Sequence, residues 1–369
     1  MTTLQDLREQ LDRLDRELVD IAARRQALSA QIARVKGETG QSTRDFRRER
    51  EVLMHARTRA AELGLPPSVA ERLLQTLIRS SLATQEQARV AAGGLGSGQR
   101  ALVIGGRGKM GRWFVEFLAS QGFDVTVADP AGPLTGFAHA PRWEELALDQ
   151  DVIVIATPLG VTDGILAQIA ARPPRGLVFD IGSLKTPLRT GLGALVQARC
   201  RVTSVHPMFG PDTDLLSGRH VIFVDLGDAQ ALQAARGLFA QTMAEQVVMT
   251  LDEHDRLIAY VLGLSHALNI AFFTALAQSG EDAPRLAQLS STTFDAQLDV
   301  ATRVAGESPA LYYEIQRLNA YGAESLAALQ SAVTQLCRIV SEGDEARFAS
   351  LMTRGREYLA GRAARAAPA

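Results

Sequence analysis

Three glycines stand where the phosphates of a nucleotide can be bound. Gly106, Gly108 and Gly111 form a GxGxxG pattern between an apolar segment, 101–106, and a segment of helical periodicity, 109–121. Glycine at these positions allows a tight turn and a close approach of the backbone to a pyrophosphate, and the following helix offers free N–H groups. A glycine-rich turn that binds nothing is the plainer interpretation of the pattern alone.

The next apolar segment supplies the acid that such a site needs. Asp129 follows Gly111 by eighteen residues, where a carboxylate can accept hydrogen bonds from ribose hydroxyls and repel a 2′-phosphate. The sequence therefore predicts a dinucleotide site that prefers NAD to NADP. Arg107 and Arg112 lie nearby and can serve a phosphate, which leaves NADP open.

Polar side chains lie at the C-terminal ends of three later apolar segments. Thr157, Ser183 and His206 all stand at or just beyond such ends. Ligands of open α/β sheets bind outside the carboxyl ends of the strands, so we expect these side chains near the nicotinamide end of the cofactor. A neutral imidazole can take the proton of an alcohol while hydride leaves carbon. Alone, a histidine that merely ends a strand before a proline turn is an equally good interpretation of His206.

Cations occur at helical spacing near the N-terminus. Arg25 and Lys36 are eleven residues apart, which in a helix is three full turns plus a rotation of about 20°. Both side chains therefore project from one helix face. Arg8 precedes Arg25 by 17 residues, about 100° off that face, and is better placed to reach the site of a second subunit. Arg-rich helices are usually solvated faces, so the spacing alone does not decide for a binding site.

Three folded parts are needed to position these residues. Residues 1–91 have helical periodicity and predict an all-α domain, and the glycine-rich residues 92–99 predict a flexible linker. Residues 100–250 alternate apolar strands with helix-length segments, which predicts an α/β doubly wound Rossmann domain with a parallel sheet. Helical periodicity returns over residues 251–369 and predicts an all-α C-terminal domain.

The first helix predicts self-association. Its apolar residues alternate spacings of three and four, which is typical of a helix packed lengthwise on a partner. They are Leu4, Leu7, Leu11, Leu14, Leu18, Ile21, Leu28, Ile32 and Val35. They imply a helix of about 35 residues, roughly 50 Å long. Two further helices leave it half exposed in a monomer, so we expect a homodimer.

Composition excludes several classes of protein. With 46% apolar and 22% charged residues the chain is not expected to be largely disordered. Its net charge of −2 provides no overall positive potential that would attract nucleic acid or anionic lipid. Cys200 and Cys337 form no CxxC pair, so neither a disulfide framework nor a metal cluster is expected. We also expect no signal peptide and no apolar run of about 18 uncharged residues, hence no membrane span and a cytoplasmic protein.

With these motifs the chain resembles the bifunctional T-protein family, in which a chorismate mutase is joined to a prephenate dehydrogenase. The first ninety residues are similar to the all-helical chorismate mutases in LREQLDRLD, ARRQALSAQIARVK, TRDFRRER and SSLATQ. The remainder is similar to prephenate dehydrogenases in HPMFGPD at 206–212, and also in DIGSLK, LDEHD and LSHAL. The resemblance covers almost the whole chain.

The resemblance to chorismate mutases implies substrate-binding places for Arg8, Arg25, Lys36, Arg48, Glu49, Ser81 and Gln85. The rearrangement of chorismate is pericyclic, so the site must hold a compact conformer and stabilise negative charge on the breaking ether oxygen. Lys36 supplies a cation for that charge, and Gln85 can donate to the ether oxygen. Glu49 can donate only if it is protonated, so its pKa would have to be raised.

The resemblance to prephenate dehydrogenases implies four further roles. They are His206 as catalytic base, Ser183 beside the nicotinamide and the alcohol, His266 near the substrate, and Arg303 on its ring carboxylate. Asp295 stands where some relatives carry an arginine, and an acid there can pair with Arg303. The family also implies a C-terminal dimerisation domain and inhibition by tyrosine.

Other interpretations stay open at this point. One is an arogenate- or NADP-using dehydrogenase whose N-terminal helices serve only as a dimerisation arm, and another is a binding protein that senses NAD without turnover. The sequence does not decide the strength of tyrosine inhibition, passage of prephenate between sites, or assembly beyond a dimer.

Overall fold

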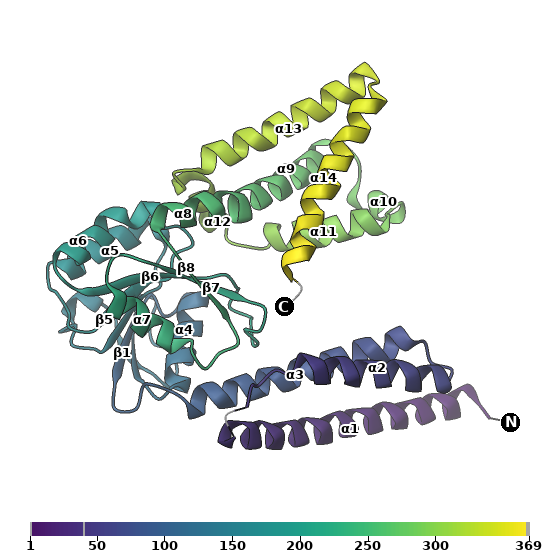
Figure 1. Ribbon diagram of the computed structural model, residues 1–369, viewed down its shortest axis with the longest axis horizontal. Coiled ribbons are helices and arrows are strands. Elements are labelled where there is room, and N and C mark those ends of the chain that lie inside the picture. The colour runs from purple at the N-terminus through teal and green to yellow at the C-terminus, as the bar shows by residue number, and fades with distance from the viewer. Residues whose placement is uncertain (1, 40, 367–369) are drawn as a thin grey trace. The chain divides into compact units, whose positions relative to one another are not determined.

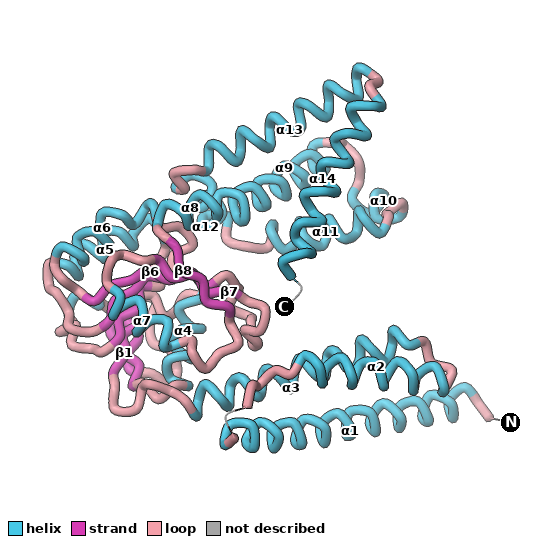
Figure 2. The backbone as a smooth tube through the Cα atoms, viewed as in Figure 1, coloured by secondary structure: helices cyan, strands magenta, loops and turns pink. Residues whose placement is uncertain are grey.

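The computed structural model describes residues 2–39 and 41–366, and it divides into two compact units. The first runs to Ser183 and includes Leu188–Thr250. The second combines Leu184–Pro187 with the chain from Leu251 onward. All described strands belong to the first unit, and the described part of the second is built of helices and loops (Figure 2). The expected combination of helical, α/β and helical parts is confirmed.

Three helices form the N-terminal part of the first unit (Figure 1). They are α1 (Leu4–Glu38), α2 (Phe46–Glu62) and α3 (Pro67–Ala92). Thr3 and Asp6 cap the start of α1 reciprocally, and Asp45 caps α2 by accepting a hydrogen bond from the backbone of Arg48. Helix α3 packs against both α1 and α2. The nine apolar residues of α1 that alternate spacings of three and four, which we call the apolar stripe, are each 46–65% exposed. This exposure is what their spacing predicted for a single chain.

The segment between α3 and the sheet is packed, which differs from the flexible linker that its composition predicted. Gly96 donates its N–H to the carbonyl of Gln121 at 3.0 Å. An added Cβ would stand 2.3 Å from that carbonyl at Gly94 and 2.4 Å from Phe123 at Gly96. The glycines are therefore required by close backbone packing rather than by flexibility.

An eight-stranded sheet follows, in the order β3-β2-β1-β4-β5-β6-β7-β8. Its strands are β1 (Arg100–Ile104), β2 (Asp124–Ala128), β3 (Ala138–Ala140), β4 (Val152–Ile155), β5 (Leu177–Asp180), β6 (Arg201–Pro207), β7 (His220–Val224) and β8 (Glu245–Met249). The helices α4 (Lys109–Ser120), α5 (Leu159–Ala170), α6 (Arg189–Gln197) and α7 (Ala229–Leu238) connect them. Apolar residues on both faces of the central strands are buried, as expected of a doubly wound sheet.

Strand β7 corrects the expectation of an all-parallel sheet, because it pairs with β6 in antiparallel register, His206 opposite Ile222. The connection 208–219 contains no helix that could carry the chain back for a parallel crossover, so the chain returns alongside the strand it has just left. The short strands β3 and β8 were also not predicted.

The second unit is helical. It contains α8 (Leu251–Ile258), a π-helical turn (Ala259–Leu264), α9 (Ser265–Gln278), α10 (Ala283–Gln288), α11 (Thr292–Ala305), α12 (Pro309–Leu318), α13 (Gly322–Glu342) and α14 (Glu345–Ala366). The continuous stretch Leu251–Gln278 is long and apolar enough to cross a membrane, so the expectation that no such segment exists was wrong. Its polar groups are engaged by neighbouring helices: Gln297 donates to Asn269, and Gln316 donates to the carbonyl of Gly263.

Candidate active sites

A cavity of about 370 Å³ lies among the three N-terminal helices. Six residues named from the sequence line it together: Arg25, Lys36, Arg48, Glu49, Ser81 and Gln85. They come from the second half of α1, the first turn of α2 and the middle of α3. We call this cavity the front pocket. The structure thus brings together residues that are up to sixty positions apart in the sequence.

Two cations of the front pocket donate hydrogen bonds to neutral oxygens, although the charge of Lys36 also acts on the nearby carboxylate of Asp45. The Arg25 guanidinium donates to the Ser81 hydroxyl at 2.8 Å and to the carbonyl of Leu77 at 3.1 Å. The Lys36 ammonium donates to the carbonyl of Thr43 at 2.9 Å. Both side chains are half-buried, so their charges are positioned and only partly screened by water.

The Gln85 amide is the buried polar group of the pocket. Its Nε2 donates to the Ser29 hydroxyl at 2.6 Å, while its Oε1 is buried without a hydrogen-bond partner. A half-turn of the amide would exchange these atoms, so that Oε1 accepts from Ser29 and Nε2 is left to donate. A ligand oxygen in the pocket would then satisfy the buried group.

Glu49 lies in the front pocket but is engaged as an acceptor. Its two carboxylate oxygens accept from Arg44 Nε at 2.9 Å and Arg44 Nη2 at 3.0 Å, which differs from the donor role that the sequence suggested. Arg44 Nη1 also donates to the hydroxyl of Ser217 at 2.6 Å. Ser217 lies in the segment that follows His206, so a residue of the α/β domain helps to orient Glu49.

A second contact of this kind is made by Glu86. Its carboxylate is 3% exposed and accepts the backbone N–H groups of Leu216, at 2.7 Å, and of Met243. Burial raises the pKa of Glu86, although these N–H donors and the charge of Arg89 oppose the shift. Glu86 was not predicted from the sequence, where the one signal is its place directly after Gln85.

The remaining two predicted mutase residues lie less favourably in one chain. The Arg48 side chain pairs with Glu51 at 3.2 Å and is mostly exposed. Arg8 does not line the front pocket, and 17 residues of helix place it about 25 Å from Arg25 along α1. A single chain therefore lacks Arg8 at its own pocket.

The glycine turn at the end of β1 forms a tight cradle that is packed too closely for side chains. An added Cβ would lie 2.7 Å from Val127 at Gly106 and 2.1 Å from the carbonyl of Gly105 at Gly111. Gly108 precedes the first residue of α4 as its N-cap, where free N–H groups are available to phosphates. Gly105, which the sequence analysis did not single out, has φ +85°, and its Cβ would meet the carbonyl of Ala156 at 2.6 Å.

Asp129 and Thr157 flank this cradle. The Asp129 carboxylate accepts the N–H of Arg107 at 3.0 Å and of Ala131 at 2.9 Å, so it is held against the turn. At Gly105 an added Cβ would lie 3.1 Å from Thr157 Cγ2, which places the end of β4 beside the same turn. The structure brings the glycines, the acid and Thr157 together.

Ser183 and His206 lie at the ends of β5 and β6. The buried Asp180 carboxylate accepts the N–H of Gly182 at 2.8 Å and so shapes the turn that presents Ser183. His206 is 4% exposed. Phe209, three residues later, packs edge-on against Trp113 of α4 at 5.0 Å, which ties the segment after His206 to the helix that follows the glycine turn.

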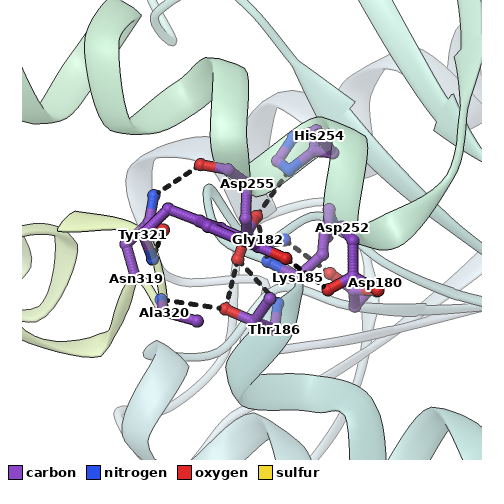
Figure 3. Close-up of polar contacts among 10 residues, drawn as sticks. All are labelled: Asp180, Gly182, Lys185, Thr186, Asp252, His254, Asp255, Asn319, Ala320 and Tyr321. Carbon is purple, nitrogen blue, oxygen red and sulfur yellow. Dashed lines mark hydrogen bonds and ion pairs between the residues drawn. The ribbon is translucent and has the colours of Figure 1, made fainter. Parts of the chain in front are cut away.

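In the second unit a buried carboxylate holds the segment that follows Ser183 (Figure 3). Asp255 accepts from the backbone N–H groups of Lys185 at 2.8 Å and Thr186 at 2.7 Å, and from His254 Nδ1 at 2.6 Å. Burial disfavours its charge, but the hydrogen bonds from His254 and Thr186 prevail and lower the pKa of Asp255. Asn319 donates to the Asp255 carbonyl at 2.9 Å. His254 and Asp255 belong to the LDEHD string that the resemblance singled out, but neither had been assigned a role.

The other two predicted dehydrogenase residues belong to the same unit. The His266 ring lies edge-on to Tyr312 at 4.1 Å, its Nδ1 is buried without a hydrogen-bond partner, and burial lowers its pKa to about 4. Arg303 is exposed and makes no hydrogen bond or ion pair with any described residue. Asp295 accepts from Ser290, so in this structure it does not neutralise Arg303.

Comparison with known proteins identifies the three parts. Residues 7–86 match the chorismate mutase type II family, residues 135–248 the nucleotide-binding domain of prephenate dehydrogenase, and residues 250–354 its dimerization domain. The T-protein of Enterobacter agglomerans is 27% identical over 360 residues, which cover 97% of this chain and 94% of the relative.

Two further relatives match the dehydrogenase part. The 4-amino-4-deoxyprephenate dehydrogenase of Streptomyces pristinaespiralis is 30% identical over 273 residues, 70% of this chain and 91% of the relative. Prephenate dehydrogenase from A. aeolicus shares the fold, with a TM-score of 0.55, 18% identity and coverage of 71% of this chain and 97% of the other. The chain therefore belongs to the prephenate dehydrogenase family and carries a type II chorismate mutase domain, as a bifunctional enzyme of tyrosine biosynthesis.

Proposed function

We propose that the front pocket converts chorismate to prephenate, and that the second reaction is the NAD-dependent oxidative decarboxylation of prephenate to 4-hydroxyphenylpyruvate. The observation that carries the first step is the convergence of Arg25, Lys36 and Gln85 on one cavity. The test supplies chorismate and NAD to the purified chain and follows chorismate loss and NADH gain together. Loss of chorismate without NADH would remove the second reaction from the proposal.

In the mutase step the residues of the front pocket act by position and charge. Arg25 is held by Ser81 and faces the pocket with donors for a substrate carboxylate. Lys36 and the Gln85 amide stabilise the negative charge that develops on the ether oxygen. No proton needs to be transferred, so Glu49 needs no donor role, and its pairing with Arg44 keeps its carboxylate in place at the pocket.

We infer that Arg8 reaches the front pocket of a second chain. The exposed apolar stripe of α1 runs along the side on which Arg25 lies, so a partner helix that covers it can bring its own Arg8 to this pocket. The C-terminal part matches a dimerization domain as well. The proposed assembly is a homodimer in the cytoplasm, and the apolar stretch Leu251–Gln278 would belong to its helical core rather than to a membrane.

The residues around the glycine turn fit a dinucleotide. The absence of Cβ atoms at Gly106 and Gly111 lets the turn pack tightly, the N-terminus of α4 offers free N–H groups to a pyrophosphate, and Asp129 offers oxygens to ribose hydroxyls. A nicotinamide cofactor, when bound, supplies the hydride acceptor. Asp129 favours NAD over NADP because its charge repels a 2′-phosphate.

In the dehydrogenase step the chain's own groups manage the proton and the carboxylates. His206 takes the proton of the C4 hydroxyl of prephenate, and Ser183 donates to the same oxygen. The ring carboxylate leaves as carbon dioxide, and its bonding electrons complete the aromatic ring. Arg303 binds this carboxylate beforehand, and a neutral His266 offers a hydrogen bond rather than a charge.

The relatives act on different substrates, so substrate choice must be measured. Rates with prephenate, arogenate and 4-amino-4-deoxyprephenate, each with NAD and with NADP, separate the possibilities. The proposal expects prephenate with NAD to give the highest kcat/KM. A higher value with an amino substrate would assign this chain to another branch of the family.

A further inference from the structure

A second cavity adjoins the front pocket. It measures about 570 Å³ and lies between the C-terminal ends of α1 and α3 and Gln241, in the loop after α7. We call it the back cavity. Lys36, Thr43 and Gln85 line both the back cavity and the front pocket, so the two are neighbours across these side chains.

The back cavity extends to a side of α1 that the front pocket does not reach. Arg34, which lines only the back cavity, follows Arg25 by nine residues, which is about 180° around a helix. The apolar Leu28 and Ile32 lie within about 60° of Arg25, on the side of the exposed stripe. Arg34 therefore lies on the side of α1 away from the stripe, whereas Lys36 lies on the side of Arg25 and reaches both cavities.

The polar lining of the back cavity is cationic. Arg34, Lys36 and Arg89 contribute three positive charges, and no described lining side chain is acidic. The Arg89 guanidinium donates to two neutral acceptors, Gln241 Oε1 at 3.0 Å and Thr43 Oγ1 at 3.2 Å. Glu86 also senses the charge of Arg89, but its carboxylate is occupied by two backbone N–H groups.

Small residues make the space between the helices. Ala33 and Gly37 of α1 face Ala88 and Ala92 of α3 across the cavity. At Gly93 an added Cβ would lie 2.8 Å from the Gln241 side chain, so the wall contributed by the α/β domain is in close contact with α3. None of the described residues that line the cavity is aromatic, which suits a ligand recognised by its charges rather than by ring stacking.

We propose that the back cavity is a second dicarboxylate site, which binds prephenate while the front pocket is occupied. Lys36 and Gln85 face both cavities, so a carboxylate that leaves the front pocket past Lys36 meets Arg89 and Arg34 next. The Gln85 amide lies at this junction, and in its flipped orientation, with Oε1 accepting from Ser29, the buried atom left without a partner is Nε2, which can donate to a carboxylate. The inference rests on the proposed function, because it takes its ligand from the mutase reaction.

The test is product inhibition of the mutase in the full chain without NAD. Initial rates of chorismate loss are measured at several prephenate concentrations for the natural chain, Arg34→Gln and Arg24→Gln. Arg24 is the matched control, an exposed arginine on the same helix that lines neither cavity. Prephenate in the front pocket competes with chorismate, whereas prephenate in the back cavity inhibits even at saturating chorismate.

The proposal expects mixed inhibition in the natural chain. In Arg34→Gln the inhibition constant measured at saturating chorismate, which reports on the back cavity, rises about three- to fivefold, the effect expected when one exposed charge contact is lost. The competitive inhibition constant, which reports on the front pocket, stays unchanged. Arg24→Gln behaves as the natural chain. Purely competitive inhibition in the natural chain, or the same mixed inhibition in all three, would overturn the second site. A chain that never consumes chorismate would instead refute the proposed function, before prephenate is added.

Discussion

The neutral ring of His266 leads to a defined pH dependence of stability. Burial lowers the pKa of His266 from 6.5 to about 4. Because the folded-state pKa lies below the unfolded one, the fold is stabilised above about pH 6.5, and this stability is lost as the pH falls towards 4. The full difference corresponds to about 3 kcal/mol in the free energy of unfolding, of which about 2 kcal/mol is lost between about pH 8 and pH 5.

The assay compares urea unfolding of the natural chain and His266→Gln at both pH values. Both tryptophans, Trp113 and Trp143, lie in the first unit, so unfolding of the helical unit must be followed by circular dichroism. The variant should lose about 2 kcal/mol less than the natural chain on acidification. His55→Gln, at an exposed position of α2, is the control and should keep the natural pH dependence.

A direct titration of the ring completes this test. The proton NMR signal of the His266 ring should remain that of neutral imidazole down to about pH 5. Titration near pH 6.5, or equal loss of stability in both chains, would refute the burial of this ring. If the prediction holds, any fall of dehydrogenase activity between pH 7 and pH 5 belongs to a group other than His266.

Three further predictions concern the two sites and the assembly. Lys36→Ala should lower mutase kcat by about 10²–10³-fold, as for other groups that stabilise a developing oxyanion, with oxidation of supplied prephenate retained; equal loss of both activities would indicate unfolding or one shared site. Ser217→Ala should lower mutase kcat a few-fold through Arg44, with no change in dehydrogenase kcat, whereas Ser341→Ala, in α13 of the second unit, should leave both unchanged. A mutase rate equal to that of Ser341→Ala would show that the contact has no role. Leu18→Glu should shift the sedimentation profile towards monomer and lower mutase activity together, because Arg8 would no longer reach the partner's pocket; an active monomer would contradict this.

Local patterns predicted the parts of the structure that depend on local physics. The spacing of Leu4 to Val35 predicted one long helix with an unpaired apolar stripe, and both are present. The glycine pattern predicted a turn in which Cβ atoms do not fit, as at Gly111. Each depends on the period of a helix or the size of one side chain, which a sequence displays directly.

Other features depend on contacts between distant segments. Glu86 and Arg44 look like ordinary charges on helices, and only the folded chain shows that the segment Leu216–Ser217 contacts both. The antiparallel return of β7 follows from a connection without a helix, which its apolar strand pattern does not reveal. The same holds for Asp255, whose partners Lys185 and Thr186 are about seventy residues away.

Two expectations drawn from composition, the flexible linker and the lack of a long apolar segment, were wrong. Gly94 and Gly96 suggested flexibility, but they are needed because the backbone of the α/β domain approaches too closely for any side chain. The run from 257 to 278 contains no Asp, Glu, Lys or Arg. Its hydrogen-bond partners Gln297 and Gln316 come from α11 and α12, so they cannot be recognised from the residues of the run alone.

The central claim is that two separate sites in one chain act in sequence, and complementation tests it directly. Lys36→Ala and His206→Asn each remove one site, so neither variant alone should form NADH from chorismate and NAD. An equimolar mixture should form NADH after a lag, because prephenate released by one variant is oxidised by the other. A mixture that stays inactive while both variants remain folded would contradict the account.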